Sequence, residues 1–161
     1  NPTDSGAPFY DAYACADGGW VSLAAVEKKF YAEALRVLNL PELLARQWDK
    51  THWPEAKAQI AARFMARSRA DWCEAFEGVE ACFAPVLTLA EAPSHPHLAS
   101  RGVYADIDGV TQPMPAPRFS GTPSPTPHAF RPWDPQEAQA ILGPWLDASA
   151  IEAASQSGLF D

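Results

Sequence analysis

The chain has 161 residues, a formal net charge of −8 and a sequence pI of about 4.9. This acidity argues against a non-specific nucleic-acid surface, because such a surface needs clustered Lys and Arg side chains to neutralise phosphates. No apolar run approaches the roughly 20 residues that a membrane-spanning helix requires, so the sequence predicts a soluble protein without a membrane partner. The length fits one domain, or one compact domain with an extension.

The three cysteines, Cys15, Cys73 and Cys82, are odd in number and form no C-x-x-C pair. This usage predicts reduced thiols in a cytoplasmic protein rather than a disulfide framework. Cys73 and Cys82 stand among aromatic residues, so we expect them to be buried as small apolar side chains. The chain begins at Asn1 without an initiator methionine or a secretory leader, which predicts a piece of a larger protein.

Short runs of aromatic and β-branched residues predict a β-hairpin at the start of the chain. The two runs, residues 9–14 and 20–26, flank the turn sequence Ala-Asp-Gly-Gly at residues 16–19. The apolar period then changes to that of an amphipathic helix over residues 30–38, which Asn39 and a following proline should end.

A second helix is predicted to begin at about Pro54, with an apolar stripe of Trp53, Ala56, Ile60 and Phe64. A third should follow the sequence Ser-Arg-Ala-Asp at residues 68–71, which resembles a capping box, and should stop at Gly78. Residues 82–87 predict a third strand, in which Pro85 indicates an edge or a strand end. The order of elements predicts an α+β fold for residues 1–92, a small antiparallel β-sheet with packed helices.

Residues 93–133 are predicted to form a loop, a β-hairpin and an extended return arm. We interpret residues 93–97 as loop, and Asp108-Gly109 between two short apolar runs predicts the hairpin. Eight of the sixteen prolines lie between Pro113 and Pro135, and this density favours an extended connector.

Residues 134–161 predict a tail of two short helices. Asp134 should cap the first, which ends near Gly143, and Ser149 should open the second, which Gly158 stops. Two short helices are marginal by themselves. We therefore expect their apolar side chains to be buried against another surface, either the domain of residues 1–92 or a large domain outside this chain.

The candidate chemistry centres on Glu27. The sequence contains no phosphate loop, dinucleotide fingerprint, nucleophile elbow or H-E-x-x-H motif. His95 and His97 form the one close histidine pair, but no Cys or carboxylate stands at a helpful spacing, so we expect no metal site. Glu27 is placed in the first turn after the second strand, where a carboxylate interacts favourably with the helix dipole. From position alone, stabilising the helix is the commoner role.

A series of motifs favours a catalytic role for Glu27 over a purely helix-stabilising one. They resemble the small domain of α-methylacyl-CoA racemases, which belong to the family III CoA-transferase (CaiB/BaiF-like) superfamily, and they occur in family order over most of residues 6–120. The clearest are GAPFYDAY at 6–13, VSLAAVEKKFY at 21–31, RADW at 69–72, ACFAPVL at 81–87 and QPMPAPRFS at 112–120. The tail resembles the family only in being helical.

The resemblance implies an isomerase that interconverts (R)- and (S)-2-methylacyl-CoA thioesters by 1,1-proton transfer through an enolate. Such chemistry needs acid/base groups on opposite faces of the substrate and a stabilised enolate oxygen. The resemblance implies no metal or redox cofactor, since CoA is part of the substrate. It also implies that a histidine and an aspartate of a large N-terminal domain are the bases, and that Glu27 completes the site by pairing with the histidine.

The large domain, which makes most of the acyl-CoA contacts in the family, is absent from this sequence. None of His52, His95, His97 and His128 falls at the family's catalytic position, so the chain alone is expected to be inactive. The resemblance further implies a homodimer of interlocked subunits. Two alternatives remain: a fragment of a family III acyl-CoA transferase, for which we do not expect a glutamate at position 27, and a non-catalytic interaction module of the same fold.

Overall fold

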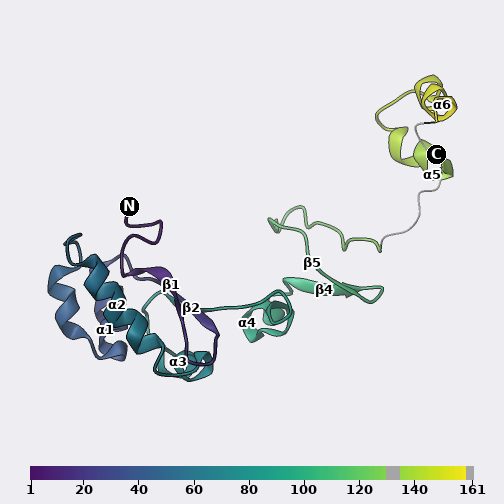
Figure 1. The fold of residues 1–161 in the computed structure, drawn as a ribbon. Helices are drawn as coiled ribbons and strands as arrows, with labels where there is room; N and C mark the ends of the chain where they lie inside the picture. The colour runs from purple at the N-terminus through teal and green to yellow at the C-terminus, as the bar shows by residue number, and fades with distance from the viewer. Residues whose placement is uncertain (130–134, 159–161) are drawn as a thin grey trace. The chain divides into compact units, whose positions relative to one another are not determined.

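The computed structural model describes residues 1–129 and 135–158 (Figure 1). The chain divides into two compact units, Asn1–Ala92 and Pro93–Asp161. The first unit contains β1 (Tyr10–Ala14), β2 (Trp20–Ala24) and β3 (Phe83–Val86) in one antiparallel sheet of order β1-β2-β3. The predicted α+β class is confirmed.

The hairpin of β1 and β2 closes through the predicted turn. The Cys15 amide donates to the Gly19 carbonyl at 2.8 Å, and Gly18 has a φ of 79°, which a glycine adopts without steric cost. In β2, Val21 and Leu23 are buried whereas Ala24 is exposed, so the strand alternates between a core face and an outer face. Pro85 pairs with Val21 from the edge strand β3, as predicted.

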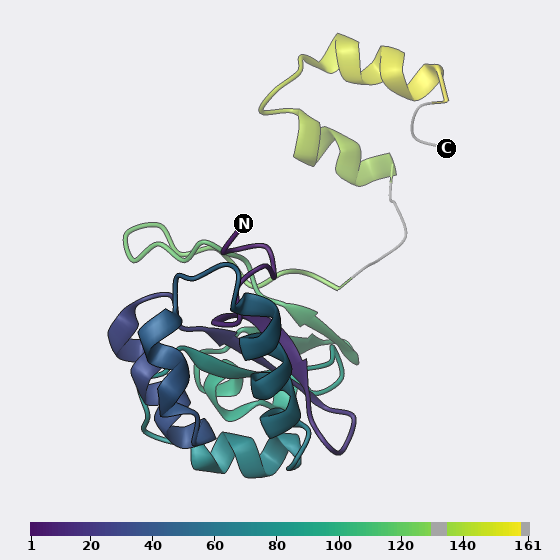
Figure 2. The same cartoon turned by 60° about the vertical axis from the view of Figure 1, so that its left-hand side comes forward.

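Three α-helices and one 3₁₀ helix complete the first unit. They are α1 (Lys28–Leu38), η1 (Pro41–Arg46), α2 (Trp53–Phe64) and α3 (Arg69–Ala75). Figure 2 shows α1 and α2 side by side against the sheet. Helix α1 ends at Asn39, whose left-handed φ of 56° lets its amide reach the Arg36 carbonyl. Helix α2 buries the whole stripe predicted for it.

The capping box of α3 is confirmed, because Ser68 and Asp71 exchange side-chain and backbone hydrogen bonds. The predicted stop at Gly78 is wrong. Helix α3 ends at Ala75, and Phe76 leaves the helical conformation to stack its ring on Phe83 at 4.1 Å between centroids. Gly78, with a φ of 70°, belongs to the turn that follows.

The core of the first unit is aromatic and is centred on Phe64. This side chain is fully buried and contacts the rings of Tyr13, Trp72, Phe76 and Phe83 at centroid distances between 5.2 and 6.4 Å. These rings come from β1, α2, α3, β3 and the turn after α3. The core therefore ties both ends of the unit's sequence to its middle.

In the second unit, α4 (Pro96–Ser100) precedes a hairpin of β4 (Tyr104–Ile107) and β5 (Val110–Pro113). Asp108 and Gly109 both have positive φ, which confirms the predicted two-residue turn. The loop predicted for residues 93–97 is wrong in part. A short 3₁₀ turn, η2 (Ala92–Ser94), stands there, and Pro96 occupies the first position of α4, where its missing amide hydrogen costs nothing.

The tail contains α5 (Pro135–Leu142) and α6 (Ala148–Gln156). Helix α6 begins earlier than predicted, because Asp147 rather than Ser149 is its N-cap and accepts the Ala150 amide at 2.8 Å. The predicted cap Asp134, and Leu159 and Phe160, lie outside the described residues. In the tail Ile151 is buried, while Ile141, Trp145 and Leu146 are exposed. No helix of the described residues is long and apolar enough to cross a membrane.

Candidate active site at the start of helix α1

Glu27 occupies the N-cap position of α1, not the first turn that the sequence predicted. Its backbone is extended, with φ −74° and ψ 138°, and its side chain makes no capping hydrogen bond. The difference of one residue matters, because an N-cap side chain commonly accepts a backbone amide of the first turn, and the Glu27 carboxylate does not. Glu27 is exposed, and within the described residues its carboxylate has no hydrogen-bond or ion-pair partner.

The backbone around Glu27 is held from both sides. Its own carbonyl accepts the Tyr31 amide at 3.0 Å, which is the first hydrogen bond of α1. The preceding carbonyl, that of Val26, accepts the side-chain amide of Gln47 at 2.8 Å. Ala25, one residue earlier, donates its amide to the Phe9 carbonyl at 2.8 Å. An unpaired carboxylate therefore stands on a fixed stretch of backbone.

Cys82 lies close enough to Glu27 for the Glu27 carboxylate to act on its thiol electrostatically. Its carbonyl accepts the Ala24 amide at 3.0 Å where β2 ends, and it adopts a left-handed φ of 49°. Partial burial and then the negative charge of Glu27 raise the pKa of the Cys82 thiol. The predicted burial of Cys82 is wrong, since this residue is exposed, and the thiol belongs to the surroundings of the candidate site.

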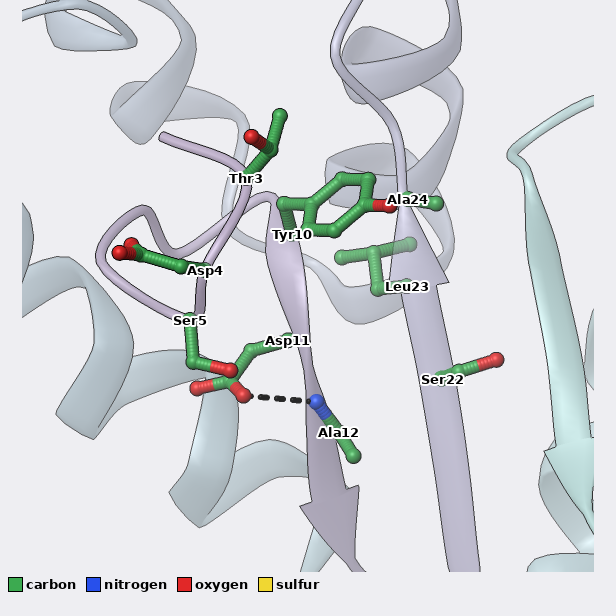
Figure 3. A pocket seen from close by; sticks show the side chains of 9 residues that line it. All are labelled: Thr3, Asp4, Ser5, Tyr10, Asp11, Ala12, Ser22, Leu23 and Ala24. Carbon is green, nitrogen blue, oxygen red and sulfur yellow. Dashed lines mark hydrogen bonds between the residues drawn. The ribbon is translucent and has the colours of Figure 1, made fainter. Parts of the chain in front are cut away.

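A pocket of about 360 Å³ opens beside the same end of the hairpin, lined by residues 3–5, 10–12 and 22–24 (Figure 3). Its carboxylate at the edge of β1, Asp11, accepts the Ala12 amide at 2.9 Å and pairs with the Lys57 ammonium at 2.8 Å. Burial raises the pKa of Asp11, but hydrogen bonds from Lys57 and Ser5 outweigh it, so the pKa lies below its ordinary value. Asp11 is thus a paired, ionised carboxylate, whereas Glu27 is unpaired.

The histidines are not brought to Glu27 within either unit. His52 precedes α2 and lies 3.1 Å from the Glu55 carboxylate. His95 and His97 belong to the N-cap and first turn of α4, in the other unit. Within the described residues, no group of three or more His, Cys, Asp or Glu side chains could hold a metal ion.

Two residues of this site were not singled out as site residues from the sequence. Gln47 lies far from Val26 in the chain, and nothing in its local pattern indicates which carbonyl it binds. Cys82 reaches Glu27 only through the pairing of β2 with β3. No local signal singles out Gln47, which follows the exposed Arg46 and precedes Trp48, whose side chain is 57% exposed.

Comparison with known proteins gives these residues a context. The family model of CoA-transferase family III matches residues 1–139. The chain belongs to CoA-transferase family III.

Its curated relatives in that family include two racemases. The chain is 41% identical over 126 residues to the α-methylacyl-CoA racemase of Mus musculus, and the match covers 77% of this chain and 33% of that protein. It is 37% identical to the α-methylacyl-CoA racemase of Homo sapiens, with the same coverage. A CaiB/baiF CoA-transferase family protein of Caenorhabditis elegans is 28% identical, over 69% of this chain and 32% of that protein. The chain therefore spans about a third of the length of these relatives.

Solved structures share the fold of this chain. Rv3272 from Mycobacterium tuberculosis, in its orthorhombic form, has a TM-score of 0.59 to this chain and is 15% identical. The match covers 71% of this chain and 35% of that one. A second crystal structure of Rv3272 gives the same TM-score, at 16% identity.

Proposed function

We propose that this family III chain is the C-terminal part of an α-methylacyl-CoA racemase, and that Glu27 completes the proton-transfer site. The reaction interconverts (R)- and (S)-2-methylacyl-CoA by removing the Cα proton and returning it on the other face of a planar enolate. The observation that carries the proposal is the Glu27 carboxylate, exposed and without a partner in the described residues, on a backbone held at both neighbouring peptides. The two racemases among its relatives supply the reaction class.

In this proposal Glu27 acts on a histidine rather than on the substrate. A carboxylate next to an imidazole favours the protonated ring and orients it, so it raises the pKa of the histidine and sets which nitrogen faces the Cα. The histidine, and an aspartate on the other face of the substrate, would come from the two thirds of the relatives' length that this chain does not span. A free carboxylate at the N-cap of α1 is suited to such a partner, because it has no interaction to break first.

The enzyme uses no metal or redox cofactor, since the thioester itself acidifies the Cα proton, and most of the acyl-CoA contacts lie outside this chain. The active form is a homodimer in which this small domain faces the large domain of the other subunit. The location is cytoplasmic, which fits three cysteines that all remain free thiols.

The test uses the full-length protein that carries this sequence, with a 2-methylacyl-CoA in deuterated buffer and mass spectrometry to follow Cα exchange. Glu27→Gln should slow exchange roughly 100-fold or more, because a positioned acid/base system contributes about 10²–10⁴ to such rates. Glu33→Gln is the matched control on α1, where the carboxylate pairs with Arg36 at 2.9 Å, and it should leave exchange unchanged. The isolated 161-residue chain should show no exchange. An unchanged rate in Glu27→Gln would remove Glu27 from the site.

A transferase is the alternative within the family, and the same preparation distinguishes it. The protein is incubated with an acyl-CoA and a second free carboxylic acid, and formation of the second acyl-CoA is followed. New thioester without Cα exchange would replace the racemase by a transferase. Cα exchange without new thioester supports the racemase.

A further inference from the structure

Gln47 is the buried polar residue of the first unit's core. Its exposed fraction is 4%, and it follows η1 in the connection to α2. Its backbone carbonyl accepts the indole N–H of Trp53 at 2.8 Å, so the residue is anchored independently of its side chain. Such a residue is unusual in an otherwise apolar and aromatic core, and its presence requires a reason.

The side chain of Gln47 makes one hydrogen bond. Its Nε2 donates to the Val26 carbonyl at 2.8 Å, while its Oε1 is buried and has no hydrogen-bond partner within the described residues. A buried amide oxygen without a partner destabilises a fold, and an apolar side chain of the same size would avoid that cost. The donor to Val26 is therefore what the amide supplies to the protein.

That donor controls the peptide on which Glu27 stands. The Val26 carbonyl and the Glu27 amide belong to one planar unit, so the direction of the carbonyl fixes the position of the Glu27 Cα. The next peptide is fixed by the hydrogen bond from the Tyr31 amide to the Glu27 carbonyl. With both peptides held, Glu27 keeps its backbone dihedrals while its carboxylate stays free.

The hydrogen bond of Gln47 also closes a ring of contacts around the junction of β2 and α1. Trp53 packs edge-on against Phe9 at 5.9 Å between ring centroids, and the Phe9 carbonyl accepts the amide of Ala25. The path from Gln47 through Trp53 and Phe9 thus returns to the residue next to Val26. Gln47 therefore contacts the start of α1 directly through Val26, and indirectly through Trp53 and Phe9.

We infer that Gln47 is a positioning residue for the catalytic function of Glu27. The inference rests on the proposed function. Through the Val26 carbonyl, the Gln47 amide holds Glu27 where its carboxylate meets the histidine of the proton-transfer site. Its role is geometric, so losing the donor should lower the turnover number and leave substrate binding in place.

The test compares Gln47→Leu and Gln59→Leu in the full-length protein. Gln59 carries the same amide on α2, where it contacts the exposed Glu55 carboxylate at 3.4 Å. In Gln47→Leu we expect kcat for Cα exchange to fall roughly 10- to 100-fold, as small displacements of catalytic groups do. KM should stay within about twofold. The melting temperature should change little, because the loss of an unpaired buried amide oxygen offsets the loss of the hydrogen bond to the Val26 carbonyl. Gln59→Leu should match the parent.

A second variant keeps the inference testable if Gln47→Leu fails to fold. In Gln47→Glu the new carboxyl can donate to the Val26 carbonyl only when protonated, and burial raises its pKa. The exchange rate of Gln47→Glu is normalised to the folded fraction from circular dichroism and divided by the parent's rate at each pH. This ratio should rise as the pH falls. A ratio that does not change with pH overturns the inference.

The outcomes separate this inference from the proposed function. If folded Gln47→Leu has the kcat of the parent while Glu27→Gln exchanges slowly, the proposed role of Gln47 is overturned and that of Glu27 stands. Parent-like exchange in Glu27→Gln overturns the role of Glu27 itself, and the role of Gln47 with it. If Gln47→Leu and Gln47→Glu lose melting temperature and kcat to the same extent, and the exchange rate of Gln47→Glu does not recover at low pH, the role of Gln47 is structural only. That outcome also overturns the inference.

Discussion

Cys82 and Glu27, far apart in the sequence, are neighbours at the end of the hairpin, where partial burial and the Glu27 charge together raise the pKa of the Cys82 thiol. A raised pKa means less thiolate at neutral pH and slower alkylation. Glu27→Gln should therefore lower the pKa of Cys82 and speed its alkylation by iodoacetamide at a fixed pH near 7. Peptide mapping by mass spectrometry gives the rate at Cys82 across the pH range.

Three variants check the electrostatic origin of that effect. Glu80 also raises the pKa of Cys82, so Glu80→Gln should speed alkylation, whereas Lys29 lowers this pKa and Lys29→Gln should slow it. Glu33→Gln on α1 should have no effect. Identical pH–rate profiles for the parent and Glu27→Gln would show that the carboxylate does not act on this thiol.

Glu91 predicts an acid-sensitive step in stability. Its carboxylate pairs with the Arg69 guanidinium and accepts the Thr88 amide at 2.8 Å, which lowers the pKa of Glu91 from 4.5 to about 2. Because the folded pKa lies below the unfolded one, this stabilisation is complete above about pH 4.5 and is lost as the pH falls toward 2. The urea midpoint should fall between about pH 6 and about pH 3, and by less in Glu91→Gln. Glu77→Gln, at an exposed residue, should retain the full fall; an equal fall in Glu91→Gln would contradict the prediction.

Phe64 should be the most sensitive position of the core. It is fully buried among four aromatic rings, so Phe64→Ala leaves a cavity and should destabilise the first unit by about 3–5 kcal/mol. Phe119→Ala removes the same ring from a residue that is 59% exposed and should change stability by less than about 0.5 kcal/mol. Urea unfolding followed by circular dichroism measures both. Similar values for the two variants would show that the ring cluster is not the core.

The cap of α3 gives a smaller, well-defined effect. Ser68 accepts the Asp71 amide at 3.1 Å, and Asp71 accepts the Ser68 amide at 3.2 Å. Ser68→Ala should cost roughly 0.5–2 kcal/mol of unfolding free energy, while Ser68→Thr should keep most of it because threonine supplies the same hydroxyl to the amide and the carboxylate of Asp71. Equal losses in the two variants would show that the side-chain acceptor is not what stabilises α3.

Local patterns predicted most of the first unit, because its elements follow simple periods. All four buried residues of the α2 stripe were predicted, since an apolar repeat of helical spacing indicates a helix face that packs on the core. In the second unit, the turn at Asp108 and Gly109 was predicted as well, because two successive positive φ values favour that pair. Helix α4 was missed because a helix of five residues that begins with a proline looks like a loop, being too short for an apolar period to develop.

The candidate site was predictable in part. Glu27 was singled out by the family resemblance, whereas its place as an unpaired N-cap depends on where α1 starts, which local pattern leaves uncertain by a residue or two. The bond from Gln47 to Val26 joins a side chain after η1 to the end of β2, and only the packed chain brings them together. Tertiary contacts of this kind leave no periodic mark in the sequence.

The exposed indole of Trp145 gives the tail an optical reporter of its own environment. This side chain is 84% exposed after α5, while Trp53 and Trp72 are buried in the first unit. An indole in water fluoresces at longer wavelength than one in an apolar contact. Binding of the tail to another surface that covers Trp145 would therefore shift the Trp145 emission to the blue. A Trp145→Phe difference spectrum would isolate that signal, and it would register assembly of the chain with a partner before any enzymatic assay is available.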